Sequence, residues 1–134
     1  MFQLPFPVHD VNASSGSKDL GNLPEWDLSD LYSSQNAPEL SRDLQWLDQE
    51  CASFAADYEG KLANLDAAEM LACVLRNERI NTIAGRIMSF AGLRYYQLTI
   101  DGDRTKFMSD MQEKITNFTT PLVFFTLELN RIDD

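Results

Sequence analysis

The residue types that most often carry out catalysis or bind metals are scarce in this chain. Its 134 residues include one histidine, His9, and two cysteines, Cys51 and Cys73. A hydrolytic zinc site takes three protein ligands, and the helical H-E-x-x-H motif takes two histidines, so His9 alone cannot build either. A Ser-His-Asp or Cys-His arrangement would also have to use His9, which lies in a leader rich in Ser, Gly, Pro and Asn. The sequence therefore assigns no catalytic residue and no metal ligand, and it leaves the substrate-binding residues unknown.

Carboxylates are plentiful, because 21 Asp and Glu residues stand against 11 Lys and Arg residues and give a formal charge of -10. A surface of that sign repels phosphate backbones and anionic lipids, so neither nucleic acid nor a membrane is an expected partner. On the predicted helices the carboxylates fall on the polar face, where they are solvated or paired with Lys and Arg. An acid-base pair among them is not expected, since strong pKa shifts need burial. The six glycines match neither nucleotide-binding fingerprint.

The two ends of the chain differ in composition. Residues 1–22 show no sustained hydrophobic period and predict a disordered tail, whereas large apolar residues return from residue 23 onward. The longest apolar stretch is far too short to span a bilayer, and the N-terminus lacks a basic region followed by an apolar block. These features predict a cytoplasmic protein in which Cys51 and Cys73 are reduced core thiols.

The first amphipathic pattern predicts a helix between Asn36 and Gly60. Asn36 is the predicted N-cap, Pro38 lies in the first turn, and Gly60 can adopt the left-handed conformation that ends a helix. Arg42 and Asp43 fall on the predicted polar face. The apolar positions recur with gaps of three and four residues, at Leu40, Leu44, Leu47, Cys51, Phe54 and Tyr58.

A capping box formed by Asp66 and Glu69 predicts the start of the next helical pattern. The polar run 76–79 leaves open whether this pattern is one helix or two. The face beyond it is strongly apolar, which predicts a central position in the fold. Its main stripe consists of Ile80, Ala84, Ile87, Ala91, Tyr95 and Leu98.

The last pattern follows a turn and cap at residues 101–103 and passes through Pro121 without a change of register. It favours one helix kinked at Pro121, while a new helix capped by Thr120 is the alternative. Its stripe consists of Met108, Met111, Ile115, Phe118, Leu122, Phe125 and Leu129. Counted with separate stretches before and after residues 76–79, four helical patterns with short connections and no period-two strand predict an all-α, antiparallel bundle of about four helices.

Three small residues share one face of the second helical pattern, which is the one predicted to be central. Gly85, Ser89 and Gly92 lie at helical spacing, although each interior glycine costs about 1 kcal/mol relative to alanine. They predict a close approach by another backbone or side chain. The sequence leaves open whether this contact comes from another helix of the chain or from protein outside it.

Three short segments carry distinctive sequences: residues 23–32 are LPEWDLSDLY, residues 58–62 are YEGKL, and residues 124–131 are FFTLELNR. In order and spacing they resemble the N-terminal portion of oligoendopeptidase F, a zinc metallopeptidase related to the thimet oligopeptidases. The resemblance implies that residues 23–134 are the helical N-terminal region of a larger all-α enzyme. In that family the fold encloses a deep channel in which short peptides are hydrolysed.

The resemblance also implies where the chemistry lies. In the family, the two histidines of a C-terminal H-E-x-x-H helix and a more distant glutamate bind zinc, and the motif glutamate activates water. None of these positions occurs in this chain, so zinc is expected in the full-length enzyme and not in this segment, which alone would be inactive. The expected partners are the missing C-terminal catalytic region and, in the full-length enzyme, oligopeptide substrates. Trp26, Tyr32 and Trp46 would either dock on the catalytic half or close this chain's own core.

Two further hypotheses belong to other classes of protein. The chain could be a stand-alone helical module that binds a protein partner through the Gly85 face or the strip around Trp26. A weaker hypothesis is a carrier of a small ligand held in a pocket between the helices, which would show ligand-dependent stabilisation.

Overall fold

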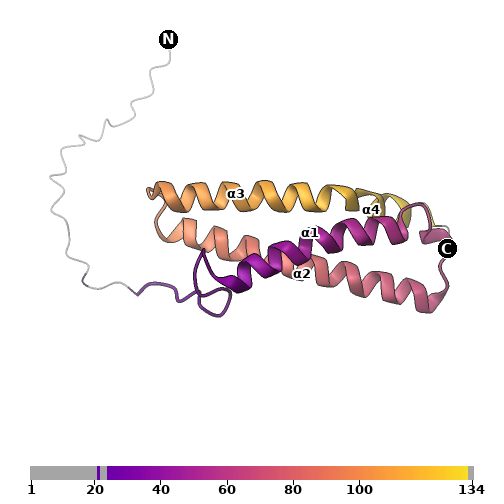
Figure 1. Cartoon of the computed structure of the whole chain (residues 1–134), viewed down its shortest axis with the longest axis horizontal. Helices are drawn as coiled ribbons and strands as arrows, with labels where there is room; N and C mark the ends of the chain where they lie inside the picture. The colour runs from indigo at the N-terminus through magenta and orange to yellow at the C-terminus, as the bar shows by residue number, and fades with distance from the viewer. Residues whose placement is uncertain (1–20, 22–23, 133–134) are drawn as a thin grey trace, which may run out of the picture.

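A computed structural model describes Gly21 and residues 24–132, in which three long helices lie along one another (Figure 1). They are α1 (Pro38–Tyr58), α2 (Ala67–Gln97) and α3 (Gly102–Thr119), and α2 packs against both α1 and α3. A shorter helix, α4 (Val123–Leu129), follows α3. Two 3-10 turns complete the fold, η1 (Leu62–Asn64) between α1 and α2 and η2 (Thr120–Leu122) between α3 and α4. The predicted all-α class is confirmed, with no strand among these residues.

Some predictions lie beyond this region. His9 and all of the predicted tail, residues 1–22, apart from Gly21, fall outside the described residues. Within the described part of the chain, every helix falls short of the combined length and hydrophobicity that crossing a membrane requires.

The N-terminus of α1 lies one residue later than the sequence predicts. Pro38 lies in the first turn, as predicted, but it is the first helical residue, and the N-cap is Ala37, which has no capping side chain. A residue before proline is held in extended conformation, and Ala37 has φ -61° and ψ 135°. The predicted cap, Asn36, instead donates its backbone N–H to Ser34 Oγ at 3.2 Å. At the other end, Gly60 has the predicted positive φ, 77°.

Helix α2 begins with the predicted capping box and continues without a break. The Glu69 N–H donates to Asp66 Oδ1 at 2.9 Å, and the Asp66 N–H donates to Glu69 Oε2 at 3.0 Å. The polar run 76–79 stays helical, and its first residue, Arg76, pairs with Glu50 and Asp57 of α1, both at 2.7 Å. The polar run is therefore a bridge to the neighbouring helix and not the end of α2.

Pro121 interrupts the last helix in a way that differs from both sequence-based alternatives. Helix α3 starts at the predicted cap, where Asp101 accepts from the Asp103 and Arg104 N–H groups. It ends at Thr119, and the chain passes through the single turn η2 directly into α4. The Thr120 hydroxyl donates back to the Thr116 carbonyl at 2.7 Å and does not cap α4. A 3-10 turn accommodates proline because Pro121 lies near its start, where no N–H is needed.

The core runs along α1 and α2 and is completed by residues of the Tyr32 turn, α3 and α4. The α1 stripe is confirmed as buried at Leu40, Leu47, Cys51 and Phe54, and the α2 stripe at Ile80, Ala84, Ile87 and Ala91. The last stripe contributes fewer buried residues to the core than its regular spacing suggests. In α3 only Met111 is buried, and in α4 the buried residues are Phe125, which belongs to the stripe, and its neighbour Phe124. Leu98 is exposed, because α2 ends at Gln97. Tyr32 belongs to the core, whereas Trp26 is 57% exposed.

Both cysteines are free and buried, as predicted. Burial, with a smaller contribution from the carboxylates of Glu50 and Asp48, raises the pKa of the Cys51 thiol to about 11, and burial raises that of Cys73. A thiol of this kind is a poor nucleophile at neutral pH.

We therefore expect neither thiol to react with a disulfide reagent such as dithiobisnitrobenzoate on the timescale of manual mixing, while the urea-unfolded chain titrates two thiols. The native reaction should proceed only as fast as the protein opens. Rapid stoichiometric labelling of the native protein would contradict the buried placement.

Candidate functional site

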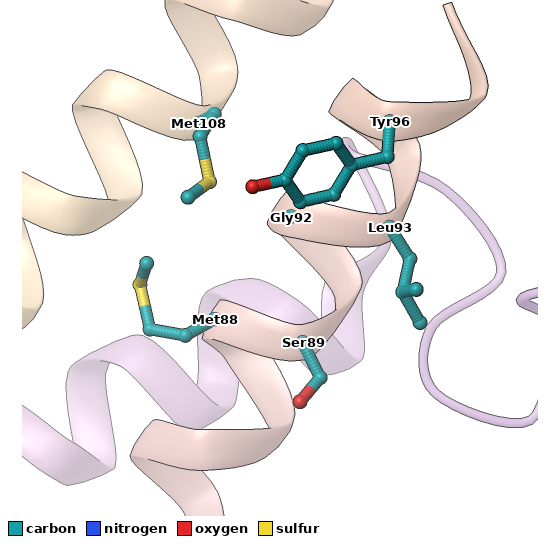
Figure 2. Close-up of a pocket in the computed structure, with 6 residues that line it drawn as sticks. All are labelled: Met88, Ser89, Gly92, Leu93, Tyr96 and Met108. Carbon is teal, nitrogen blue, oxygen red and sulfur yellow. The ribbon is translucent and has the colours of Figure 1, made fainter.

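An open apolar groove of about 470 Å³ lies between the C-terminal half of α2 and the start of α3. Figure 2 shows Met88 and Met108 extending toward one another from the two helices, with the Tyr96 ring closing one end. We call this surface the apolar groove, and its lining residues are Met88, Ser89, Gly92, Leu93, Tyr96 and Met108.

The groove follows from helical spacing and from one missing side chain. Its five α2 residues occupy positions i, i+1, i+4, i+5 and i+8, which share one face. Gly92 forms the floor, where an added Cβ would lie 4.0 Å from Met108 Cε. A larger residue at position 92 would fill the space that the two methionines border. Flexible thioether side chains adapt to different apolar partners, which suits a docking surface.

The groove adjoins the N-terminal strip predicted from the sequence. A second hollow, of about 240 Å³, shares Tyr96 with the groove and is lined also by Pro24, Glu25, Trp26 and Gln97. Gln97 Nε2 donates to the Trp26 carbonyl at 2.7 Å, which holds the strip against the end of α2. Tyr96 is 67% exposed between these two hollows. The two surfaces that the sequence proposed separately, the small-residue face and the Trp26 strip, therefore meet at Tyr96.

Gly85 does not take part in this surface. Among the described residues the predicted close approach is not seen: a Cβ built at Gly92 would lie at an ordinary contact distance of 4.0 Å from Met108 Cε, and none of these residues lies within 4 Å of a Cβ built at Gly85. Gly85 is exposed, one turn before Ser89 on the helix.

We expect Gly85→Leu to leave the free energy of unfolding unchanged or to raise it by up to about 1 kcal/mol, because leucine is the better helix former and meets no neighbour. Gly92→Leu should behave in the same way, because its Cβ reaches Met108 Cε only at an ordinary contact distance and the rest of the side chain enters the open groove. Urea denaturation of the two variants measures the effect. A loss of more than about 1 kcal/mol in either variant would show that a neighbour packs tightly against this face.

A second, polar pocket lies between α1 and α2. Its volume is about 350 Å³, and we call it the arginine pocket, lined by Arg42, Asp43, Trp46, Arg79, Ile83 and Arg86. The three α2 residues are spaced i, i+4 and i+7 and the three α1 residues i, i+1 and i+4, so each set shares one helix face.

Asp43 corrects the expectation that helical carboxylates lie on the solvated face. It is only 7% exposed, and its Oδ2 accepts a hydrogen bond from the Tyr32 hydroxyl at 2.8 Å. Its Oδ1 lies 3.3 Å from Arg42 Nη2. Burial, followed by the hydrogen bond to Asp43, holds the pKa of Tyr32 well above its usual value. Periodicity in α1 alone could not reveal this, because Tyr32 lies eleven residues earlier in the chain.

The sequence predicted no catalytic residue and no metal ligand, and it left the substrate-binding residues unassigned. In the part of the chain that the structure describes, no three His, Cys, Asp or Glu residues come together in a way that could hold a metal ion. The apolar groove and the arginine pocket are two candidate binding surfaces.

Comparisons with known proteins add no relative: no family model matches this chain, and neither a curated protein nor a solved structure matches it.

Proposed function

We propose that this chain is the N-terminal, channel-wall region of a zinc-dependent oligoendopeptidase that hydrolyses short peptides. Zinc and the catalytic residues belong to a C-terminal region outside this chain, and the 134 residues alone are inactive. The proposal rests on the three segments that resemble oligoendopeptidase F and on what those segments do in the fold.

One contact carries the proposal. Glu128, in the third segment, accepts the Gly60 N–H at 2.6 Å and the Leu62 N–H at 3.3 Å, both in the second segment. A single carboxylate thus joins α4 to the turn that ends α1, although the two lie far apart in the sequence. This contact gives a physical reason for the two segments to occur together, and the role it gives them is structural.

The first segment, residues 23–32, also has a structural role, because it contains a hydrogen-bonded turn. The Ser29 N–H donates to Asp27 Oδ1 at 2.9 Å, and the Tyr32 N–H donates to the Leu28 carbonyl at 3.2 Å. This turn positions the buried Tyr32 side chain so that its hydroxyl donates to Asp43. All three segments therefore shape the helical scaffold, which is what a channel wall requires of them.

The catalytic region is the partner that this proposal assigns to the apolar groove. Exposed Tyr96 and Trp26 line adjoining hollows, beside a groove lined by Met88 and Met108. A contiguous exposed patch of this kind is typical of a protein interface. In the complete enzyme this surface would be covered.

The coding sequence that follows the codon for Asp134 tests the proposal. We expect an open frame that encodes an H-E-x-x-H motif, and we expect its full-length product to cleave a fluorogenic peptide in a zinc-dependent manner. A stop codon directly after Asp134 would overturn the proposal. Turnover by the 134-residue chain with added zinc would also contradict it, because the chemistry is assigned to residues outside the chain.

A second candidate function is a stand-alone helical module that binds a protein partner. The observation that favours it is the same exposed surface, where the Trp26 strip and the apolar groove meet at Tyr96. In this case the groove is a docking site for a separate protein and needs no catalytic half.

The groove itself is tested with two matched variants of α2. Leu93→Asp places a charge in the groove, and Leu71→Asp places the same charge at an exposed leucine near the start of the helix. We expect the unmodified chain to bind an apolar dye and to self-associate in sedimentation experiments, and only Leu93→Asp to reduce both. A compact monomer that binds no dye would count against an uncovered interface.

A further inference from the structure

The arginine pocket carries an excess of positive charge within a strongly acidic protein. Its lining includes three arginines, Arg42, Arg79 and Arg86, and one carboxylate, that of Asp43. Both oxygens of Asp43 are engaged, Oδ2 by the Tyr32 hydroxyl and Oδ1 by Arg42. Asp43 therefore neutralises only part of the charge that surrounds the pocket.

Arg79 is the clearest unbalanced cation. Its guanidinium carbon lies 4.8 Å from the centre of the Trp46 ring. Among residues 24–132 no carboxylate lies within ion-pair distance of it, whereas Arg76, one turn away, pairs with two. Contact with the indole face orients the guanidinium without neutralising it.

Arg86 is held in place by two backbone carbonyls, by the ring of Tyr32 and by a long ion pair with Asp43. Its Nη2 donates to the backbone carbonyls of Leu31 and Asp30, and its guanidinium carbon lies 4.6 Å from the centre of the Tyr32 ring. Its Nη1 lies 3.9 Å from Asp43 Oδ2, which is a long ion pair without a hydrogen bond. One edge of the guanidinium is thus fixed by the fold, while the other faces Asp43 and keeps its N–H donors for a further anion, so little side-chain entropy is lost on binding.

We propose that the arginine pocket binds a carboxylate group carried on a short apolar stem. The planar carboxylate matches the donor edges of Arg79 and Arg86, and the half-buried side chains of Ile83 and Trp46 offer apolar contact to the stem. The net charge of -10 disfavours dianions more than monoanions, which favours a carboxylate over a phosphate ester. The volume of about 350 Å³ suits a ligand the size of one N-acylated apolar amino acid.

This inference goes beyond the proposed function and does not depend on it. A carboxylate site is compatible with a channel wall and with a stand-alone module, because it uses only the α1–α2 pair and the turn that holds Tyr32.

The test uses the intrinsic fluorescence of Trp46. Trp26→Phe leaves Trp46 as the single tryptophan of the chain, and this variant is titrated with N-acetylleucine, N-acetylleucine amide and isopentyl phosphate. We expect a saturable change with N-acetylleucine in the millimolar range, no change with the neutral amide, and weaker binding of the phosphate ester. Equal binding of the amide, or no saturation by the carboxylate, overturns the proposal. Tighter binding of the phosphate ester overturns the choice of carboxylate.

Charge-matched variants locate the site. In the Trp26→Phe chain, Arg79→Gln should weaken binding of N-acetylleucine at least about tenfold, because it removes a charged donor. Arg131→Gln makes the same change at an exposed arginine beyond α4, outside the pocket, and should leave the affinity unchanged. Arg42→Gln should weaken binding as well, and circular dichroism checks that this variant is folded, because Arg42, although 72% exposed, also pairs with Asp43. Equal losses in Arg79→Gln and Arg131→Gln would mean that net charge, and not this pocket, determines binding.

Discussion

Phe54→Ala is expected to lower the free energy of unfolding by about 3–5 kcal/mol. The ring is fully buried, and its centre lies 4.9 Å from that of Tyr58, 6.0 Å from that of Phe124 and 5.7 Å from that of Phe125. It also lies 5.6 Å from the guanidinium carbon of Arg76 of α2. One truncation therefore opens a cavity where α1, α2 and α4 meet, and the loss is a large fraction of the stability of an ordinary domain.

Urea denaturation followed by circular dichroism measures this loss. Phe118→Ala is the matched control, because Phe118 is only partly buried against the same core and should cost clearly less. If the two variants were equally destabilised, Phe54 would not be the point at which α1, α2 and α4 are joined.

Helical periodicity predicted the class of fold and most of the core, because in α1 and α2 it is set by the face that each helix buries. It was less informative for α3, where a regular stripe is mostly half-buried. Burial there depends on how many helices pack against α3, and its own sequence does not encode that number. The start of α1 moved by one residue because Pro38 imposes an extended conformation on Ala37, a steric effect that outweighs the capping preference of Asn36.

The candidate sites were less predictable than the fold. Spacing placed Gly85, Ser89 and Gly92 on one face, but only the packing of α3 against α2 decides that Gly92 and Ser89 line a groove with Met108 while Gly85 stays open to solvent. The arginine pocket combines residues of two helices, and the charge pattern of either helix alone is that of an ordinary solvated face. The pocket exists only because α1 packs against α2, and the sequence of neither helix reveals which of its charged residues will face the other.

Asp43→Ala is expected to lower the free energy of unfolding by about 3 kcal/mol. The change leaves the buried Tyr32 hydroxyl without its acceptor, and it leaves Arg42 and Arg86 without the carboxylate that faces them. Asp43→Asn is the matched control, since its amide oxygen still accepts from the Tyr32 hydroxyl. It should cost less, and an equal cost for both variants would mean that the charge alone matters.

The pH dependence of the free energy of unfolding tests the contact between Tyr32 and Asp43 in a second way. The pKa of Tyr32 is raised in the folded protein, chiefly by burial and then by the hydrogen bond to Asp43, whereas an unfolded tyrosine ionises near pH 10. Above about pH 10 the unfolded chain loses this proton and the folded chain keeps it, so stability falls as the pH rises. The raised pKa of the buried thiols acts in the same direction, so the contribution of Tyr32 is obtained by comparison with Tyr32→Phe. Tyr32→Phe should be less stable than the unmodified chain at about pH 7, yet it should lose less stability between about pH 9 and pH 11. If both proteins lost the same amount of stability over this range, the Tyr32 hydroxyl would be solvated rather than buried against Asp43.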